Sequence, residues 1–221
     1  MVDYRRLRLN NLTSPEFRHI FLLVFWIVFG IFFSAVERLI PRTVWHPMWC
    51  PLGDKIPFCE WFFIPYMFWF VFLVGMHLYL LLFDIPAFRR FIYFIMVTYS
   101  VTMVIYLIYP TCQELRPAAF SRDNFLTRFA AGFYQFDTNT NVCPSLHCIG
   151  GFAILFAALD MPRFRQKAWP VFFTVFALLI CASTVFMKQH SIVDFFAALP
   201  VTLIGWLAVY LPALLKARKN A

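Results

Sequence analysis

The sequence predicts an all-α integral membrane protein: a single domain, residues 1–221, folded as a six-transmembrane-helix bundle. Composition and the spacing of apolar runs predict this class. Of the 221 residues, 62% are hydrophobic and only 14% are charged. A soluble domain of this length cannot hide so much apolar surface from water. The chain therefore belongs in a lipid bilayer.

Six apolar stretches are candidates for transmembrane helices, which need roughly 20 residues each. We place them at 19–39, 62–83, 88–109, 145–160, 168–187 and 191–215. The fourth is short for a full span, so it must begin below the membrane surface or run nearly upright. The first is too long for a signal peptide and lacks a small-residue cleavage site, so we interpret it as a retained anchor helix.

The cations predict the orientation of the bundle. With the amino terminus cytoplasmic, 12 of the 19 Lys and Arg fall on the cytoplasmic side and seven on the outer side. This bias places both termini in the cytoplasm. The net charge of +8 comes from the ends of apolar runs and not from a basic stripe with interleaved aromatics, so we expect no nucleic-acid partner. A small chain with almost no soluble portion is typical of a bacterial inner (plasma) membrane.

Three polar clusters interrupt the apolar sequence, and the predicted topology brings all of them to the outer face. They are Leu115-Arg116-Pro117, Cys143-Pro144-Ser145-Leu146-His147, and Lys188-Gln189-His190 with Asp194. The two long loops, 40–61 and 110–144, lie on the same side, and function tends to collect on long loops. We therefore expect the active site at the outer face.

His190 and Asp194 are four residues apart, which on a helix places them on one face. A carboxylate oxygen can then hold one imidazole nitrogen and leave the lone pair of the other exposed. Such an imidazole can attack phosphorus directly and form a phosphohistidine. The alternative is a buried pair that only packs helices, but ionisable residues in membrane segments are costly and usually functional.

His147 opens the fourth stretch directly after Pro144 and Ser145, where free backbone N–H groups at a helix start attract anions. The amides near Ser145, Leu146 and His147 are expected to hold phosphate oxygens while His147 protonates the departing alkoxide. Arg116 and Lys188 are expected to neutralise phosphate charge. Either cation could instead reach toward lipid headgroups.

The three clusters resemble the motifs of the type 2 phosphatidic acid phosphatase superfamily, written KxxxxxxRP, PSGH and SRxxxxxHxxxD. Here they run from Tyr109 to Pro117, from Pro144 to His147, and from Ser183 to Asp194. The resemblance implies a metal-independent reaction. It also implies that His190 is the nucleophile oriented by Asp194, that His147 is the general acid, and that Arg116 and Ser145 bind phosphate.

Three positions depart from the family pattern. Tyr109 replaces the first-motif Lys, Leu146 replaces Gly, and Thr184 replaces the third-motif Arg, so two phosphate ligands of the family are missing. Lys188 is a candidate substitute for one of them. The Pro-Ser-Leu-His form is similar to the branch that includes inositolphosphotransferases, which move a phospho-headgroup to an alcohol instead of to water.

The leading hypothesis is a lipid-phosphate phosphatase that hydrolyses a phosphomonoester or pyrophosphate of a lipid through a phosphohistidine. A lipid phosphotransferase with the same first step is one alternative, and a non-enzymatic carrier of anionic lipids is another. The expected partners are a phosphorylated lipid and the bilayer, with no cofactor and no metal. The sequence leaves the oligomeric state open.

Four of the six cysteines lie in or beside the outer loops. Pairs Cys50–Cys59 and Cys112–Cys143 are the most plausible disulfides in an oxidising exterior, with free thiols as the alternative. His77, near the middle of the second stretch, is interpreted as a packed, hydrogen-bonded core histidine outside the site.

Overall fold

The computed structural model describes residues 2–40 and 43–220, and over them the chain is helical apart from its loops and one short strand pair. The α-helices are α1 (Val24–Arg38), α2 (Pro51–Lys55), α3 (Phe63–Phe83), α4 (Ile85–Ile108), α5 (Phe125–Phe136), α6 (Leu146–Asp160), α7 (Trp169–Phe186) and α8 (Ile192–Lys219). The strands β1 (His46–Pro47) and β2 (Thr111–Cys112) pair in parallel and join the two long loops.

Five helical segments are long and apolar enough to cross a membrane. They are Arg18–Arg38, Glu60–Phe83, Ile85–Ile108, Trp169–Phe186 and Ile192–Lys219. The predicted fourth stretch is α6, which has 15 residues and is shorter than a span. The outward faces of the long helices expose large apolar side chains such as Ile31, Val71 and Val171, as a multi-pass membrane protein requires.

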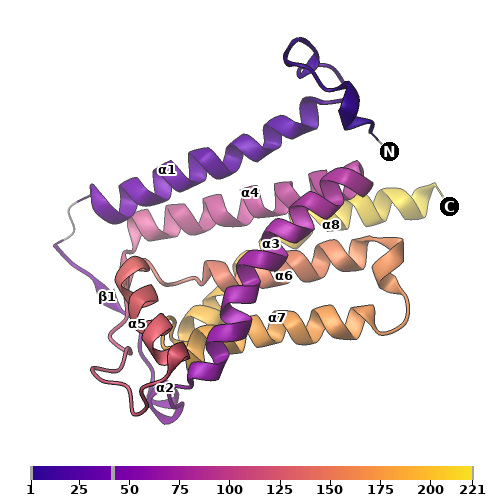
Figure 1. Ribbon diagram of the computed structural model, residues 1–221. Helices are drawn as coiled ribbons and strands as arrows, with labels where there is room; N and C mark the ends of the chain where they lie inside the picture. Colours follow the sequence, from indigo (N-terminus) through magenta and orange to yellow (C-terminus); the bar gives the residue numbers. More distant parts are fainter. Residues whose placement is uncertain (1, 41–42, 221) are drawn as a thin grey trace.

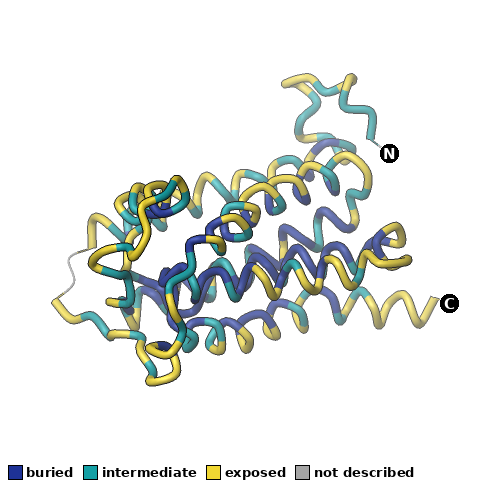
Figure 2. The backbone as a smooth tube through the Cα atoms, turned by 60° about the horizontal axis from the view of Figure 1, so that its bottom comes forward, coloured by how far each residue is buried: buried dark blue, intermediate teal, exposed yellow. Residues whose placement is uncertain are grey.

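Helix α6 lies at the centre of the bundle, in contact with α3, α4, α7 and α8 (Figures 1 and 2). Its small side chains allow this crowding. The α-carbon of Gly150 lies so close to α3 that an added Cβ would be 2.6 Å from the Trp69 Nε1 atom. Small residues at helix crossings let backbones approach closely in membrane proteins. A short central helix thus holds its amino-terminal end, with His147, in the middle of the surrounding helices.

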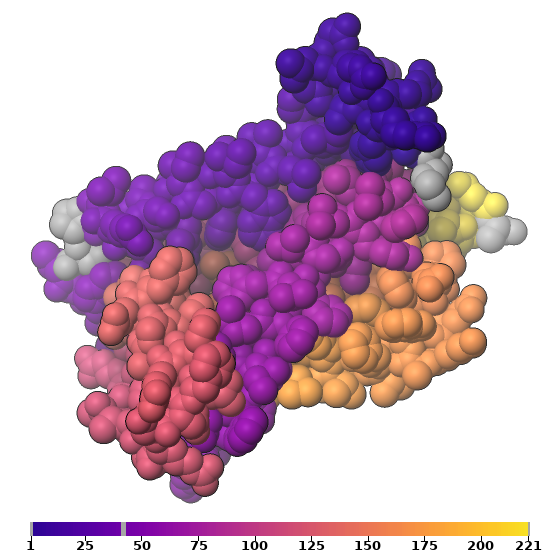
Figure 3. All heavy atoms as spheres, in the orientation of Figure 1, coloured from indigo at the N-terminus to yellow at the C-terminus, as the bar shows by residue number. Residues whose placement is uncertain are grey.

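The described parts of the two termini lie at one end of the bundle, and α2, α5 and β1 lie at the other (Figure 1). The chain ends and the loops that carry the three polar clusters thus lie at opposite ends of the bundle, while the side of the membrane that each end faces stays a prediction. The predicted loop 110–144 contains a helix, α5, that was not predicted from the sequence. It packs against the start of α3, where Phe63 meets Phe129 and Phe133 (Figure 3).

The link between α3 and α4 is shorter than expected, because α4 begins at Ile85 and not at residue 88. Asp84 is the single residue between the helices, and its side chain accepts a hydrogen bond from the Ala87 N–H. A carboxylate in this position caps the helix and allows it to begin before Pro86.

His77 is a core residue, as predicted, and the structure supplies the partner that the sequence did not name. Its Nδ1 is 2.7 Å from the Leu73 carbonyl oxygen, and its Nε2 accepts a hydrogen bond of 3.0 Å from the Trp26 indole. His77 therefore joins α1 to α3.

All six cysteines are free thiols in the structure. Neither Cys50–Cys59 nor Cys112–Cys143 forms a disulfide, so the alternative of free thiols describes the chain. The two long loops are connected instead by the β1–β2 pair and its backbone hydrogen bonds, such as the one from Met48 N to Cys112 O.

The packing of α8 on α4 predicts a selective effect of added methyl groups. A Cβ at Gly205 would lie 2.4 Å from Thr98 Cγ2, whereas a Cβ at Gly75 would have no neighbour within 4 Å. Gly205→Ala should therefore lower the thermal midpoint in detergent, at a cost of about 1–3 kcal/mol, because the helices must separate. Gly75→Ala is the matched control and should not lower it. Equal midpoints for both variants would contradict this close contact.

Candidate functional site

The tight turn between α7 and α8 positions His190. The Thr184 carbonyl oxygen accepts hydrogen bonds from the N–H groups of both Gln189 and His190, which folds the chain back over the end of α7. Lys188 adopts a left-handed backbone conformation, with φ of 54°, to complete the turn. His190 therefore lies just before α8, and not on a helix face as the spacing suggested.

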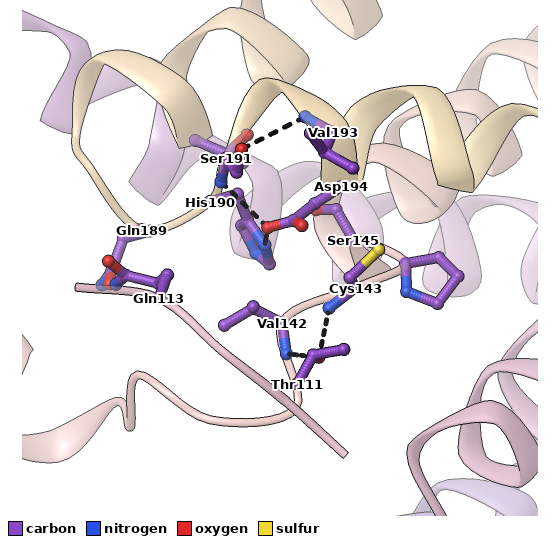
Figure 4. A network of polar contacts seen from close by, with 12 residues as sticks. Thr111, Gln113, Val142, Cys143, Ser145, Gln189, His190, Ser191, Val193 and Asp194 are labelled. Atoms are coloured by element: carbon purple, nitrogen blue, oxygen red, sulfur yellow. Dashed lines mark hydrogen bonds and ion pairs between the residues drawn. The ribbon is translucent and has the colours of Figure 1, made fainter. Parts of the chain in front are cut away.

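Asp194 is fixed by a capping box at the start of α8. The Ser191 hydroxyl caps the Val193 N–H, and Asp194 Oδ2 accepts a hydrogen bond of 2.9 Å from the Ser191 N–H (Figure 4). The same Oδ2 is 3.1 Å from His190 Nδ1. A carboxylate oxygen can only accept, so His190 Nδ1 carries the proton and Nε2 has the free lone pair when the ring is neutral.

His147 faces that lone pair. Ser145 is the N-cap of α6, its hydroxyl accepting from Cys148 N at 3.4 Å, and this cap places His147 in the first turn. His147 Nδ1 is 3.3 Å from His190 Nε2. The His147 ring packs between Tyr66 and Trp69, with ring centroids 4.7 and 4.5 Å away. These aromatics hold the imidazole against His190 Nε2.

This spacing also sets a condition on any reaction at His190. A phosphorus atom must approach to about 3–3.5 Å in line with the attacking lone pair. With His147 Nδ1 at 3.3 Å, the space directly in front of Nε2 is occupied. A phosphoryl group must therefore displace the His147 ring from its contact with His190 Nε2.

A cavity of about 50 Å³ opens beside the two histidines. Its lining includes Leu146, His147, Gln189, His190 and Tyr106. The backbone N–H groups of Leu146 and His147 have no hydrogen-bond acceptor among the described residues. They lie at the amino-terminal end of a 15-residue helix, where the helix dipole and open donors favour an anion.

Arg116 reaches the site through Gln189. Its guanidinium donates to the carbonyl oxygens of Tyr134, Asp137 and Thr138 and to Gln189 Oε1. It also lies 4.6 Å from the centroid of the Tyr134 ring. Arg116 therefore holds the end of α5 against the residue next to His190. Its positive charge lies near the cavity, but both of its Nη groups donate to protein oxygens, and only the buried Nε is without a partner among the described residues.

Lys188 is not brought to the cavity. Its ammonium donates to the carbonyl oxygens of Gly53, at 3.0 Å, and Ile56. These residues lie at the end of α2, so Lys188 ties the loop between α1 and α3 to the α7–α8 turn. The structure thus groups His147, His190, Asp194, Ser145 and Leu146, places Arg116 behind them, and directs Lys188 elsewhere.

The polar run 137–141 borders the cavity, although none of its residues is among the site residues predicted from the sequence. Asp137, Thr138, Thr140 and Asn141 line the cavity with Gln189. Asp137 Oδ2 accepts from Tyr66 OH at 3.2 Å and from Gln189 Nε2 at 3.3 Å. Burial raises the pKa of the Asp137 carboxyl above its usual value. The length of the polar run was the available signal, whereas Tyr66 is on a distant helix and gave none.

Opposing effects act on the pKa of His190. Burial by itself lowers the pKa of this imidazole, but the hydrogen bond and negative charge of Asp194, with a contribution from Asp137, raise it above 6.5. The Cys143 thiol lies beside Asp194, and its pKa is raised by burial and by that carboxylate, so the thiol stays protonated. The pair of His190 and Asp194 is therefore suited to bearing positive charge on the ring.

Comparisons with known proteins leave the site to be interpreted from its own geometry. No protein-family model matches the chain, and no curated protein or solved structure matches it.

The contact with Asp194 predicts a change in the titration of His190. In Asp194→Asn the amide oxygen can still accept from Ser191, but the negative charge is lost while burial persists. The pKa of His190 should fall below 6.5, so the ring becomes neutral at a lower pH than in the unmodified protein. NMR of protein carrying ¹⁵N-labelled histidine measures this directly.

Asp123→Asn is the matched control, because Asp123 is an exposed partner of Arg128 in the loop between α4 and α6. It should leave the His190 titration in place. An Asp194→Asn protein with an unchanged His190 pKa would show that the carboxylate does not support the imidazolium.

Proposed function

We propose that this protein is a membrane enzyme that cleaves the phosphoester of a lipid through a phosphohistidine at His190. The observation that carries the proposal is the chain of contacts from Asp194 Oδ2 to His190 Nδ1 and from His190 Nε2 to His147 Nδ1. It supplies a nucleophile, His190, with its orienting carboxylate on one side of the ring and an acid, His147, on the other side of the ring. The resemblance of the three motifs supports the same assignment of roles.

In the first step, the His190 Nε2 lone pair attacks phosphorus and the bond from phosphorus to the lipid oxygen breaks. That oxygen takes the proton of His147 Nδ1 and leaves as a lipid alcohol. The phosphorylated imidazole carries positive charge, which Asp194 stabilises. The amides of Leu146 and His147 are positioned to bind the phosphoryl oxygens, with the charge of Arg116 behind them.

In the second step, an acceptor hydroxyl gives its proton to His147 and its oxygen bonds to phosphorus as the N–P bond breaks. With water as acceptor, free phosphate leaves and the protein is a lipid-phosphate phosphatase, the leading form of the proposal. Substrate enters from the bilayer because the surrounding helices are apolar.

A lipid phosphotransferase, with an alcohol in place of water, is the second candidate. The observation that favours it is the lining of the cavity, which consists of polar and apolar side chains without a Lys or Arg among the described residues. A phosphomonoester with two negative charges is best held by several cations. A phosphodiester carries only one negative charge, so it is better suited to a cavity without a lining Lys or Arg.

The proposal predicts a strong dependence on both histidines. Purified protein is incubated with a panel of lipid phosphates while free phosphate and new phospholipids are followed. His190→Ala should reduce turnover on the order of a thousandfold or more, because the covalent step is lost. His147→Ala should reduce it about 10²-fold to 10⁴-fold. A chelator should have no effect.

The outcomes separate the candidate functions. Free phosphate that depends on His190 supports the phosphatase, and headgroup exchange without free phosphate supports the transferase. Turnover that survives His190→Ala refutes the mechanism. Lipid binding with neither product indicates the carrier that was considered from the sequence. His46→Ala is the control, because His46 stacks on Tyr109 at the β1–β2 pair and should leave turnover unchanged.

A further inference from the structure

One wall of the cavity is formed by the segment from Asp137 to Asn141, directly after α5. We call the residues Asp137, Thr138, Thr140 and Asn141 the acceptor wall. None of them has a role in the mechanism above. Their hydrogen-bonding state shows what kind of group the wall can hold.

Glu37, in the last turn of α1, takes up the donors of three wall residues. Its Oε2 accepts from the hydroxyls of Thr138, at 2.6 Å, and Thr140, at 2.7 Å. Its Oε1 accepts from the side-chain amide of Asn141. A hydroxyl has one hydrogen to donate, so after these bonds the threonine oxygens can offer only lone pairs.

Asn141 has a buried acceptor without a donor. The side chain is 3% exposed, and its Oδ1 has no hydrogen-bond partner among the described residues. The amide orientation is determined, because the group that faces the Glu37 carboxylate must be the N–H₂ donor. An unpaired buried carbonyl is costly, typically by about 1–3 kcal/mol. Asn141 Oδ1 therefore indicates a missing hydrogen-bond donor.

Asp137 adds a second acceptor to the same wall. Its Oδ2 is engaged by Tyr66 and Gln189, while its Oδ1 has no hydrogen bond to the described residues. Phosphoryl oxygens are themselves acceptors, so neither Asp137 nor Asn141 suits them. Alcohol hydroxyls are donors and do suit them.

We propose that the acceptor wall is a binding subsite for a hydroxyl-bearing group, held by Asn141 Oδ1 and Asp137 Oδ1 beside the phosphoryl position. Its place beside a reacting phosphorus rests on the proposed function, but its preference for hydroxyls rests on the wall alone. The hydroxyl has two possible sources: the headgroup that stays on phosphorus, or the alcohol that accepts the phosphoryl group.

The first test measures binding to full-length His190→Ala protein, in which turnover is not expected. The probes are dihexanoyl phosphatidylglycerol, which has headgroup hydroxyls, and dihexanoyl phosphatidylethanol, which has none. If the headgroup is the source, the Kd for phosphatidylethanol should exceed that for phosphatidylglycerol about five- to tenfold, as expected for one buried hydrogen bond. Adding Asn141→Gly should bring this ratio close to one.

Glycine is the suitable replacement because Asn141 has a φ of 49°, which other side chains adopt with strain. Asn139→Gly is the matched control: Asn139 is in the same segment, but its amide donates to the Gln113 carbonyl and it does not line the cavity. It should keep the full ratio. Because each ratio compares two lipids on one sample, a general loss of folded protein cancels.

The second test asks whether the bound hydroxyl belongs to the alcohol that accepts the phosphoryl group. Unmodified protein turns over dihexanoyl phosphatidic acid in equal concentrations of glycerol and ethanol, and the two phosphate esters are quantified. A preference for glycerol that Asn141→Gly removes and Asn139→Gly keeps supports the subsite as an acceptor site.

The inference is overturned when neither test shows a hydroxyl preference that depends on Asn141, which is the result expected if an ordered water satisfies the amide. Failure of the proposed function gives a different result, because unmodified protein then turns over none of the lipids. In that case the ratio of the two Kd values alone tests the subsite. A ratio near one overturns the subsite, and a higher ratio that is lost in Asn141→Gly supports it.

Discussion

The two hydrogen bonds accepted by Asp194 Oδ2 are the interaction on which the site depends. One comes from the Ser191 N–H and completes the cap of α8, and the other involves His190 Nδ1. The carboxylate that begins the helix therefore also sets the tautomer of the imidazole. Because the cap needs a rigid turn before it, the Thr184 carbonyl and the left-handed Lys188 serve the same end. The stability of α8 and the orientation of the His190 imidazole are therefore not separable.

The bundle adds to this turn a central helix that is shorter than its neighbours. Helix α6 begins at Leu146, inside the ring formed by α3, α4, α7 and α8. Its open amides and His147 thus lie where the α7–α8 turn can reach them. Glu37 and Arg116 then hold the segment after α5 over the cavity. Glu37 accepts hydrogen bonds from side chains of this segment, and Arg116 donates hydrogen bonds to its backbone oxygens. The site is closed by contacts from five separate parts of the chain.

Sequence reasoning predicted the helical membrane class and the residues that carry their own signal. His147 and His190 stand out because polar side chains are rare in apolar runs, and their loops point to one face. Lys188 could not be placed this way, because whether a cation faces a cavity or a carbonyl depends on where α2 ends. The hydrogen bond between Asn141 and Glu37 could not be predicted for a similar reason. The two residues are 104 positions apart in the sequence, and only the tertiary fold brings them into contact. Helix α5 was missed because its 12 residues are too few for a transmembrane span, so its apolar side chains gave no signal of that kind.

The most direct test of the account is the chemical identity of the intermediate. Protein is mixed with a short-chain lipid phosphate, quenched in alkali, where a phosphorus–nitrogen bond survives, and digested for mass spectrometry. The account predicts a phosphoryl group, alone or with its headgroup, on the peptide that contains His190, and none when Asp194 and His190 are both replaced by alanine. A substrate that is turned over without modifying His190, or a modification on His147 instead, would contradict it.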